Sequence, residues 1–224
     1  MRILTRKKGK PEYFYLQHSY RDNGKLITKE RYLGKSVPKN IKEITAQFKK
    51  ECQANLYKKL ESIKKQFQEE WKSLPKSAQE KEKEEIAIAF TYNTNAIEGS
   101  TITLEETRAI IHDEIAPKKK LKDIKETEAH STVFLEMLKK EEKITNTLLL
   151  QWHKQMFGET KEDIAGKFRE YLVRVGSYIA PDWQDVKTLM EELMRFIKKN
   201  NGMNPVELAA RSHYKFESIH PFGD

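Results

Sequence analysis

The strongest constraint on this fold is an apolar stripe at helical spacing between Ile41 and Trp71. Apolar side chains recur there at gaps of three and four positions, which places them on one face of an α-helix of about eight turns. Its members are Ile41, Ile44, Phe48, Cys52, Leu56, Leu60, Ile63, Phe67 and Trp71. Leu74-Pro75 should end the helix, because proline disfavours helical backbone in the residue before it. Such a stripe must cover a neighbouring element, so we predict a mainly α fold.

Capping signals predict further helices. Ser77-Ala-Gln-Glu80 and Thr103-Leu-Glu-Glu106 each have the form of a capping box, in which a hydroxyl and a carboxylate satisfy backbone N–H groups at a helix start. Asn204-Pro205 is a third start signal. The helix that follows it should carry an apolar face of Leu208, Ala209, Phe216 and Ile219. The predicted helices beyond the long one cover 77–97, 103–112, 123–140, 146–157, a segment near 189–196 and one from 205 onward.

Two segments are predicted to form β-hairpins. Residues 11–34 hold two runs of β-forming residues around Arg21-Asp-Asn-Gly24, where asparagine and glycine tolerate the positive φ of a tight turn. We expect a two- or three-stranded sheet that packs on the long helix, because so small a sheet is marginal by itself. Residues 165–181 should form a second hairpin around Gly176.

Positive charge is concentrated near the N-terminus. Residues 1–50 hold 14 Lys/Arg and 4 Asp/Glu, a net charge of +10, whereas the other 174 residues hold 28 and 30, a net of −2. A basic segment of this kind favours an acidic partner such as nucleic acid. Its aromatic residues Tyr13, Phe14, Tyr15, Tyr20 and Tyr32 would be able to stack on bases. A solvated basic arm and an ordinary tyrosine-rich packed sheet stay open as alternatives.

The composition also restricts where the protein works. Cys52 is the only cysteine, which excludes a disulfide framework and a cysteine-rich zinc site and favours a reducing compartment. The longest apolar run, 86–90, has five residues and is too short to span a bilayer. The charged N-terminus lacks the apolar core of a secretory signal. We therefore expect a cytoplasmic protein with no membrane partner.

The chemistry is expected near the C-terminus. His220 precedes Pro221, so the last helix should end there, and Asp224 follows four residues on. Histidine is suited to accept a proton near neutral pH, and aspartate oxygens hold divalent cations. From these residues alone, a helix-capping or partly buried histidine is the commoner interpretation.

The complete string resembles the start of the Fic family motif, His-Pro-Phe-x-(Asp/Glu)-Gly-Asn-Gly-(Arg/Lys), preceded on its helix by His-x-x-Phe-x-x-Ile. The matching residues are His213, Phe216, Ile219, His220, Pro221, Phe222 and Asp224. The resemblance implies a protein adenylyltransferase, which moves AMP from ATP to a Ser, Thr or Tyr hydroxyl of a target protein. It further implies that His220 is the general base, that Asp224 binds Mg²⁺, and that His213, Phe216 and Phe222 support the motif.

Two other segments resemble that family. Thr94-Asn-Ala-Ile-Glu98-Gly99 is similar to its inhibitory motif, which implies that Glu98 blocks the productive position of the γ-phosphate. The segment from Gly166-Lys-Phe-Arg169 to Gly176 is similar to its flap hairpin, which implies that the target binds there as an added strand. The expected flap residues are Arg174, Val175, Gly176, Ser177 and Tyr178.

The resemblance covers about residues 77–224. We therefore expect a basic β region over 1–40, a connecting helix over 41–76 and an incomplete Fic-type helical bundle with a hairpin flap over 77–224. The sequence stops at Asp224, before the family's phosphate-binding Gly-Asn-Gly-Arg, so this polypeptide alone should be inactive or nearly so, while the parent protein is an enzyme. The expected partners are ATP and a target protein, with nucleic acid and a second copy of the chain as further candidates. A Fic enzyme with another phosphate-containing donor, and a non-enzymatic nucleic-acid-binding or regulatory protein, stay open as alternatives.

Overall fold

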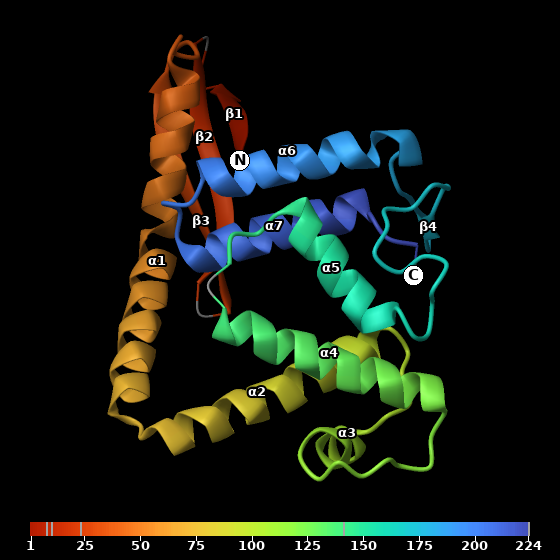
Figure 1. The fold of residues 1–224 in the computed structure, drawn as a ribbon. Helices are drawn as coiled ribbons and strands as arrows, with labels where there is room; N and C mark the ends of the chain where they lie inside the picture. Colours follow the sequence, from red (N-terminus) through yellow and green to blue (C-terminus); the bar gives the residue numbers. More distant parts are fainter. Residues whose placement is uncertain (8, 10, 23, 141, 224) are drawn as a thin grey trace. The chain divides into compact units, whose positions relative to one another are not determined.

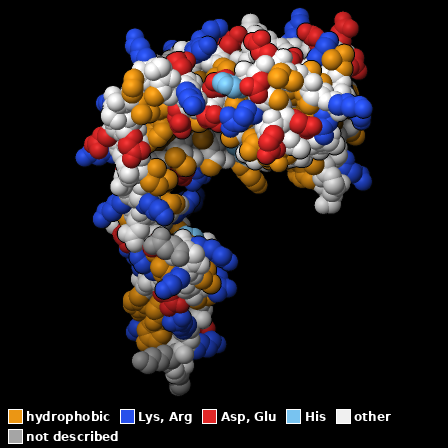
Figure 2. Space-filling model, turned by 90° about the horizontal axis from the view of Figure 1, so that it is seen from below, with side chains coloured by type: hydrophobic (Ala, Val, Ile, Leu, Met, Phe, Trp, Pro, Cys, Tyr) orange, Lys and Arg blue, Asp and Glu red, His pale blue; other side chains and the backbone are white. Residues whose placement is uncertain are grey.

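The computed structural model describes residues 1–7, 9, 11–22, 24–140 and 142–223. The chain divides into two compact units, Met1–Ser73 and Leu74–Asp224. Helices dominate and the sheets are small and antiparallel, so the predicted mainly α fold is confirmed (Figure 1). No helix in the described ranges is long and apolar enough to cross a membrane. Side chains of both charge signs, with hydrophobic ones between them, cover the face drawn in Figure 2.

The N-terminal unit consists of a sheet and one long helix. Strands β1 (Arg2–Lys7), β2 (Glu12–Asp22) and β3 (Lys25–Gly34) pair antiparallel in that order, and helix α1 covers Ile41–Ser73. Asp22 pairs with Lys25 at the end of the β2–β3 hairpin. Gly24 has a φ of 79°, which a glycine adopts without strain. Asn23, the other expected turn residue, lies outside the described residues, and β1 lies before the segment predicted to be β.

The core of this unit joins the sheet to α1. Leu16 of β2 is 2% exposed and packs with Phe48 and Cys52 of α1. This contact confirms the prediction that the sheet packs on the long helix. Further along the same apolar stripe, Ile63 and Phe67 are each 54% exposed. Within this unit, therefore, only the N-terminal part of the stripe covers a neighbouring element.

The C-terminal unit is a helical bundle that carries one short hairpin (Figure 1). In chain order its elements are α2 (Lys76–Ile97), α3 (Leu104–Ile111), α4 (Leu121–Lys139), α5 (Asn146–Phe157), β4 (Arg174–Val175), β5 (Tyr178–Ile179), the 3₁₀ turn η1 (Trp183–Asp185), α6 (Val186–Lys199) and α7 (Pro205–Ile219). Helix α2 packs on α3 and α4, α4 packs on α5, and α6 packs on α7. A core of Val186, Met190, Leu193 and Ile219 joins α6 to α7.

The apolar face predicted for α7 is partly wrong. Ile219 is buried and Leu208 and Phe216 are half-buried, but Ala209 is exposed. Adjacent helix residues point about 100° apart, so Ala209 leaves the narrow stripe that Leu208 belongs to.

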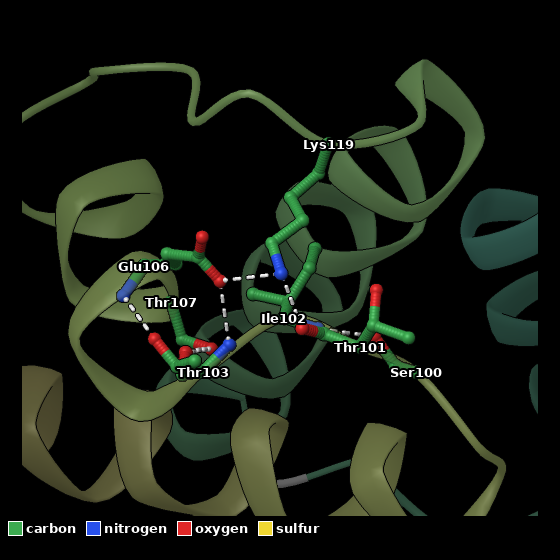
Figure 3. Close-up of polar contacts among 7 residues, drawn as sticks. All are labelled: Ser100, Thr101, Ile102, Thr103, Glu106, Thr107 and Lys119. Atoms are coloured by element: carbon green, nitrogen blue, oxygen red, sulfur yellow. Dashed lines mark hydrogen bonds and ion pairs between the residues drawn. The ribbon is translucent and has the colours of Figure 1, made fainter.

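The capping box predicted at Thr103 is present (Figure 3). The hydroxyl of Thr103 accepts from the N–H of Glu106 at 3.2 Å, and the Glu106 carboxylate accepts from the N–H of Thr103 at 2.8 Å. Lys119 Nζ lies 3.3 Å from the same carboxylate and donates to the carbonyl oxygen of Thr101 at 2.7 Å. The backbone hydrogen bond from Thr103, with help from Lys119, lowers the pKa of Glu106. These contacts anchor the segment that follows α2.

The capping box predicted at Ser77 is wrong. Helix α2 begins at Lys76, and no described side chain caps its N-terminus. Pro75, with φ −59° and ψ 153°, has the extended backbone of an N-cap residue, and its carbonyl oxygen accepts from the N–H of Gln79 at 3.0 Å. Because proline already fixes this geometry, Ser77 lies inside the first turn.

Candidate active site

His220 is the residue that caps the C-terminus of α7. Its backbone is left-handed, with φ 48° and ψ 67°, and its N–H donates to the carbonyl oxygen of Phe216 at 2.9 Å. The helix ends here, as predicted, because the following Pro221 disfavours right-handed helical backbone at His220. A left-handed conformation in a residue other than glycine costs roughly 1–3 kcal/mol, so the surroundings must hold it in place.

His220 lines a pocket of about 310 Å³. The lining residues are Thr94, Asn95, Glu98, His130, Leu149, Trp152, His153, Met156, Phe157, Phe216, Glu217, His220, Pro221 and Phe222. The pocket thus brings the end of α2 together with the end of α7. Five residues predicted from sequence line its wall: Thr94, Glu98, Phe216, His220 and Phe222.

Glu98 reaches the pocket because α2 ends there. It is the C-cap residue of α2 and is exposed, and Gly99 turns the chain away with a φ of 84°. Only glycine adopts this conformation without strain, so Gly99 suits the turn at the end of α2. Thr94, one turn earlier, is half-buried.

Phe222 is held in a cluster of aromatic rings. It stacks on His153 with ring centroids 3.9 Å apart and an interplanar angle of 9°, and it contacts Phe216 edge-on at 5.9 Å. His153 is 1% exposed, and its Nδ1 accepts from the N–H of Gly166 at 2.9 Å. Because Nδ1 accepts this hydrogen bond, the ring proton of His153 is on Nε2. Sequence analysis missed His153, which reads as one more polar position of α5.

Arg169 connects the flap to the end of α7. It is 4% exposed, and four carbonyl oxygens accept from its guanidinium, those of His220, Tyr171 and Pro181 at 2.7 Å each and that of Ile219 at 3.3 Å. Its backbone N–H also donates to the carbonyl oxygen of Pro221 at 2.9 Å. Burial lowers the pKa of Arg169, although an arginine side chain stays charged at neutral pH. The sequence marked Arg169 only as part of a family match, and nothing in its spacing indicated these contacts.

The predicted hairpin is present, although its strands are short. Strands β4 and β5 have two residues each, and Gly176 turns between them with a φ of 59°. All five expected flap residues lie on this hairpin and are exposed. Two tyrosine hydroxyls anchor it: that of Tyr178 donates to the carbonyl oxygen of Ser218 at 2.6 Å, and that of Tyr171 to the carbonyl oxygen of Gly223 at 2.9 Å.

His130 of α4 forms the wall of the pocket near α2. Its Nδ1 lies 3.1 Å from the hydroxyl of Thr91, and its ring stacks on Phe90. Burial lowers the pKa of His130, so the neutral imidazole is favoured at the pocket wall.

The predicted motif residue His213 does not line the pocket. The side chain of His213 is 75% exposed and lies 3.8 Å from Glu217 on the same helix. Asp224, the expected Mg²⁺ ligand, lies outside the described residues. The described part of the chain contains no group of three or more His, Cys, Asp and Glu that would hold a metal ion.

Known proteins are similar to this chain in sequence and in fold. Residues 143–224 match the model of the Fic/DOC family. The chain is 33% identical over 147 residues to the protein adenylyltransferase Fic of Nematostella vectensis. This match covers 62% of this chain and 34% of that protein. It is 32% identical over 153 residues to the protein adenylyltransferase Fic of Drosophila ananassae. That match covers 63% of this chain and 30% of that protein. The chain thus spans about a third of the length of these curated relatives.

Solved structures of Fic proteins are also similar to this chain. Fic-1, residues 134–508, from C. elegans superposes with a TM-score of 0.63 at 25% identity, over 83% of this chain and 57% of that one. A Fic domain containing signalling protein from Bacteroides thetaiotaomicron superposes with a TM-score of 0.61 at 26% identity, over 71% of this chain and 66% of that one.

Proposed function

Since residues 143–224 belong to the Fic/DOC family, we propose that this protein is a protein adenylyltransferase, which transfers AMP from ATP to a Ser, Thr or Tyr hydroxyl of a target protein. The observation that carries the proposal is the pocket that His220 shares with Thr94 and Glu98. The names of the curated relatives support the same reaction.

In this reaction His220 acts as the general base. The target hydroxyl attacks the α-phosphorus of ATP and its proton passes to the imidazole of His220. A new bond forms between the hydroxyl oxygen and the α-phosphorus, the bond to the bridging oxygen of the β-phosphate breaks, and pyrophosphate leaves. Stacking of Phe222 on His153 and the hydrogen bonds of Arg169 hold the backbone on both sides of the imidazole. A fixed base raises the rate because it does not have to be oriented at the moment of reaction.

Asp224 is proposed to bind Mg²⁺ together with the nucleotide phosphates. In nucleotide sites this ion is usually held by one or two carboxylates and the phosphates themselves, and it offsets phosphate charge. The described residues add no further ligand cluster to this assignment.

Glu98 is proposed to inhibit the reaction. It lines the same pocket as His220 and lies at the exposed end of α2. A carboxylate at this position repels a triphosphate and disfavours the in-line geometry that attack requires. Autoinhibition would then depend on where the end of α2 places one side chain.

The β4–β5 hairpin is proposed to bind the target as an added strand. Its side chains are exposed, and its tyrosine hydroxyls tie it to the segment around His220. Pairing of main chains fixes the position of a target hydroxyl without requiring a particular target sequence.

The test is transfer of label from α-labelled ATP by the full-length protein, with His220→Ala compared with wild type. Loss of a general base should lower the rate by on the order of 10²–10⁴-fold. His213→Ala is the matched control, because this histidine lies on the same helix with an exposed side chain, and it should keep the wild-type rate. Full activity of His220→Ala would overturn the assignment of His220 as the general base. Transfer from α-labelled UTP in place of ATP would overturn the proposal that ATP is the donor.

A further inference from the structure

The positive charge of the chain belongs to its N-terminal sheet. Residues 1–40, which contain β1, β2 and β3, hold 11 Lys/Arg and 3 Asp/Glu, a net charge of +8 that equals the net charge of the whole chain. The C-terminal unit, residues 74–224, holds 23 Lys/Arg and 26 Asp/Glu and is slightly negative. An extended polyanion would therefore be attracted more strongly to the sheet than to the unit that carries the candidate active site.

The two faces of this sheet differ. Leu16 of β2 packs on α1, and side chains alternate between faces along a strand, so Tyr15 and Gln17 lie on the face opposite to α1. Tyr15 pairs with Tyr32 of β3, and Gln17 pairs with Arg2 of β1. We call this opposite side, which carries Arg2, Arg6, Tyr13, Tyr15, Gln17, Glu30 and Tyr32, the outer face.

Aromatic rings and arginines lie in contact on the outer face. The ring centroid of Tyr32 lies 5.3 Å from that of Tyr15 and 6.1 Å from that of Tyr13. The guanidinium of Arg6 lies 4.9 Å from the ring centroid of Tyr15. Tyr32 is 54% exposed and the Arg6 side chain 53%, so both are accessible to a ligand in solution.

We propose that the outer face binds single-stranded nucleic acid, with phosphates on Arg2 and Arg6 and a base stacked on Tyr32. Unpaired bases expose the flat surfaces that aromatic side chains stack on, whereas a duplex hides them. An anionic membrane would also attract this charge, but toward the β2–β3 turn the same face carries the hydroxyls of Ser19 and Thr28, 2.8 Å apart. Leu26, 71% exposed, also lies on this face, but most of its other side chains carry a polar or charged group, so the face offers little continuous apolar area for insertion between lipids.

Glu30 competes with the proposed ligand. Its carboxylate accepts from Arg6 at 2.7 Å and from the amide of Gln17 at 2.8 Å. An exposed ion pair of this kind contributes little stability, so a phosphate is able to replace Glu30 as the partner of Arg6. Removal of this carboxylate should therefore strengthen nucleic-acid binding.

The experiment measures fluorescence anisotropy of labelled 12-nucleotide single-stranded RNA, single-stranded DNA and duplex DNA with the 224-residue chain. We expect a single strand to bind more tightly than the duplex, and the two single-stranded arms show whether RNA or DNA is preferred. The logarithm of the affinity should fall linearly with the logarithm of salt concentration, and Arg6→Gln should reduce that slope by about 0.7, the value for one phosphate contact.

The variants separate stacking from charge. Tyr32→Leu should weaken binding by roughly fivefold or more, Tyr32→Phe should retain wild-type affinity, and Glu30→Gln should increase it. Tyr214→Leu is the control, because Tyr214 is 75% exposed on α7 in the other unit, and it should bind as wild type. Equal affinity for duplex and single strands, wild-type affinity of Tyr32→Leu, or binding to vesicles of anionic lipid without binding to any oligonucleotide would each overturn the proposal. None of these measurements depends on AMP transfer.

Discussion

Arg169 shows how one side chain shapes the candidate site without contributing chemistry to it. Its planar guanidinium donates to carbonyl oxygens at both ends of the hairpin segment, on Tyr171 and Pro181, and at the end of α7, on His220. Charge-assisted hydrogen bonds of this kind are stronger than neutral ones, and together they offset the strain of the left-handed backbone at His220. Arg169 is therefore a positioning residue.

Arg169→Lys should lower the catalytic rate constant for AMP transfer by roughly tenfold or more and leave the KM for ATP nearly unchanged. An ammonium group cannot reproduce the fork of parallel donors, so the flap ends and the His220 backbone lose their common anchor. Steady-state transfer assays measure both constants, and circular dichroism checks the fold. A change in KM alone, or no change in rate in a folded variant, would contradict the positioning role.

His130 should make stability fall in weakly acidic solution. Burial lowers its pKa, so below its ordinary value of about 6.5 the unfolded chain takes up a proton that the folded chain does not. Stability is then lost as the pH falls from about 6.5 toward the lowered pKa, with a slope of at most about 1.4 kcal/mol per pH unit. Urea unfolding of wild type and His130→Gln at pH 7.5 and 5.5 measures this difference.

The matched comparison is His112→Gln. The side-chain hydrogen bond and charge of Glu84 raise the pKa of His112, so its small contribution is present at low pH and is lost as the pH rises through the raised pKa. The two variants should therefore change the pH dependence in opposite directions. The same pH dependence in His130→Gln as in wild type would show that His130 does not couple to folding.

At the scale of elements, the end of α2 places Glu98 at the wall of the pocket. Gly99 turns the chain directly after Glu98, and the Thr103 capping box with Lys119 anchors the next segment (Figure 3). The position of the Glu98 carboxylate thus depends on a helix end that is fixed from both sides. If this carboxylate inhibits AMP transfer, removal of its charge alone should relieve the inhibition.

Glu98→Gln and Glu98→Gly should both raise AMP transfer, by about fivefold or more, which corresponds to an interaction near 1 kcal/mol. Glutamine keeps the shape of the side chain and removes its charge, so equal release by both variants would assign inhibition to electrostatics. Glu162→Gln, at an exposed position outside the pocket, is the control. Transfer rates with labelled ATP decide the matter, and wild-type rates for both Glu98 variants would exclude the inhibitory role.

At the scale of the whole molecule, each of the two units has its own core. Leu16, Phe48 and Cys52 hold the sheet on α1 in the N-terminal unit. In the C-terminal unit, one cluster joins α6 to α7, and a second consists of Ile102, Ile110 and Ile124. A division of the chain after residue 40, as the sequence suggested, would separate α1 from the sheet that covers it.

Phe48→Ala should destabilise the N-terminal unit alone, by about 3–5 kcal/mol for removal of a buried phenyl ring. Calorimetry should show one transition moved to lower temperature and the other unchanged. Cys52→Ala, a smaller deletion in the same core, should move that transition less. A single transition that moves as one in both variants would show that the units unfold together.

The sequence by itself determined the features that depend on near neighbours along the chain. Helical spacing predicted α1, the Thr103 box and Asn204-Pro205 predicted the starts of α3 and α7, and Pro221 predicted the end of α7. These signals act over a few residues, so they do not depend on the rest of the fold. Ser77 failed as a cap because the adjacent Pro75 already supplied the helix start.

Only the tertiary structure decided which distant residues meet. The pocket joins Glu98 to His220, His153 of α5 stacks on Phe222, and Arg169 binds the backbone at both flap ends and at the end of α7. The family resemblance implied that Glu98 and His220 share a site, but no pattern along the chain encodes the other contacts, because each depends on how separate elements pack. For the same reason the pairing of strands was needed to place Tyr15 and Tyr32 on one face of the sheet, whereas the basic charge around them could be read from composition alone.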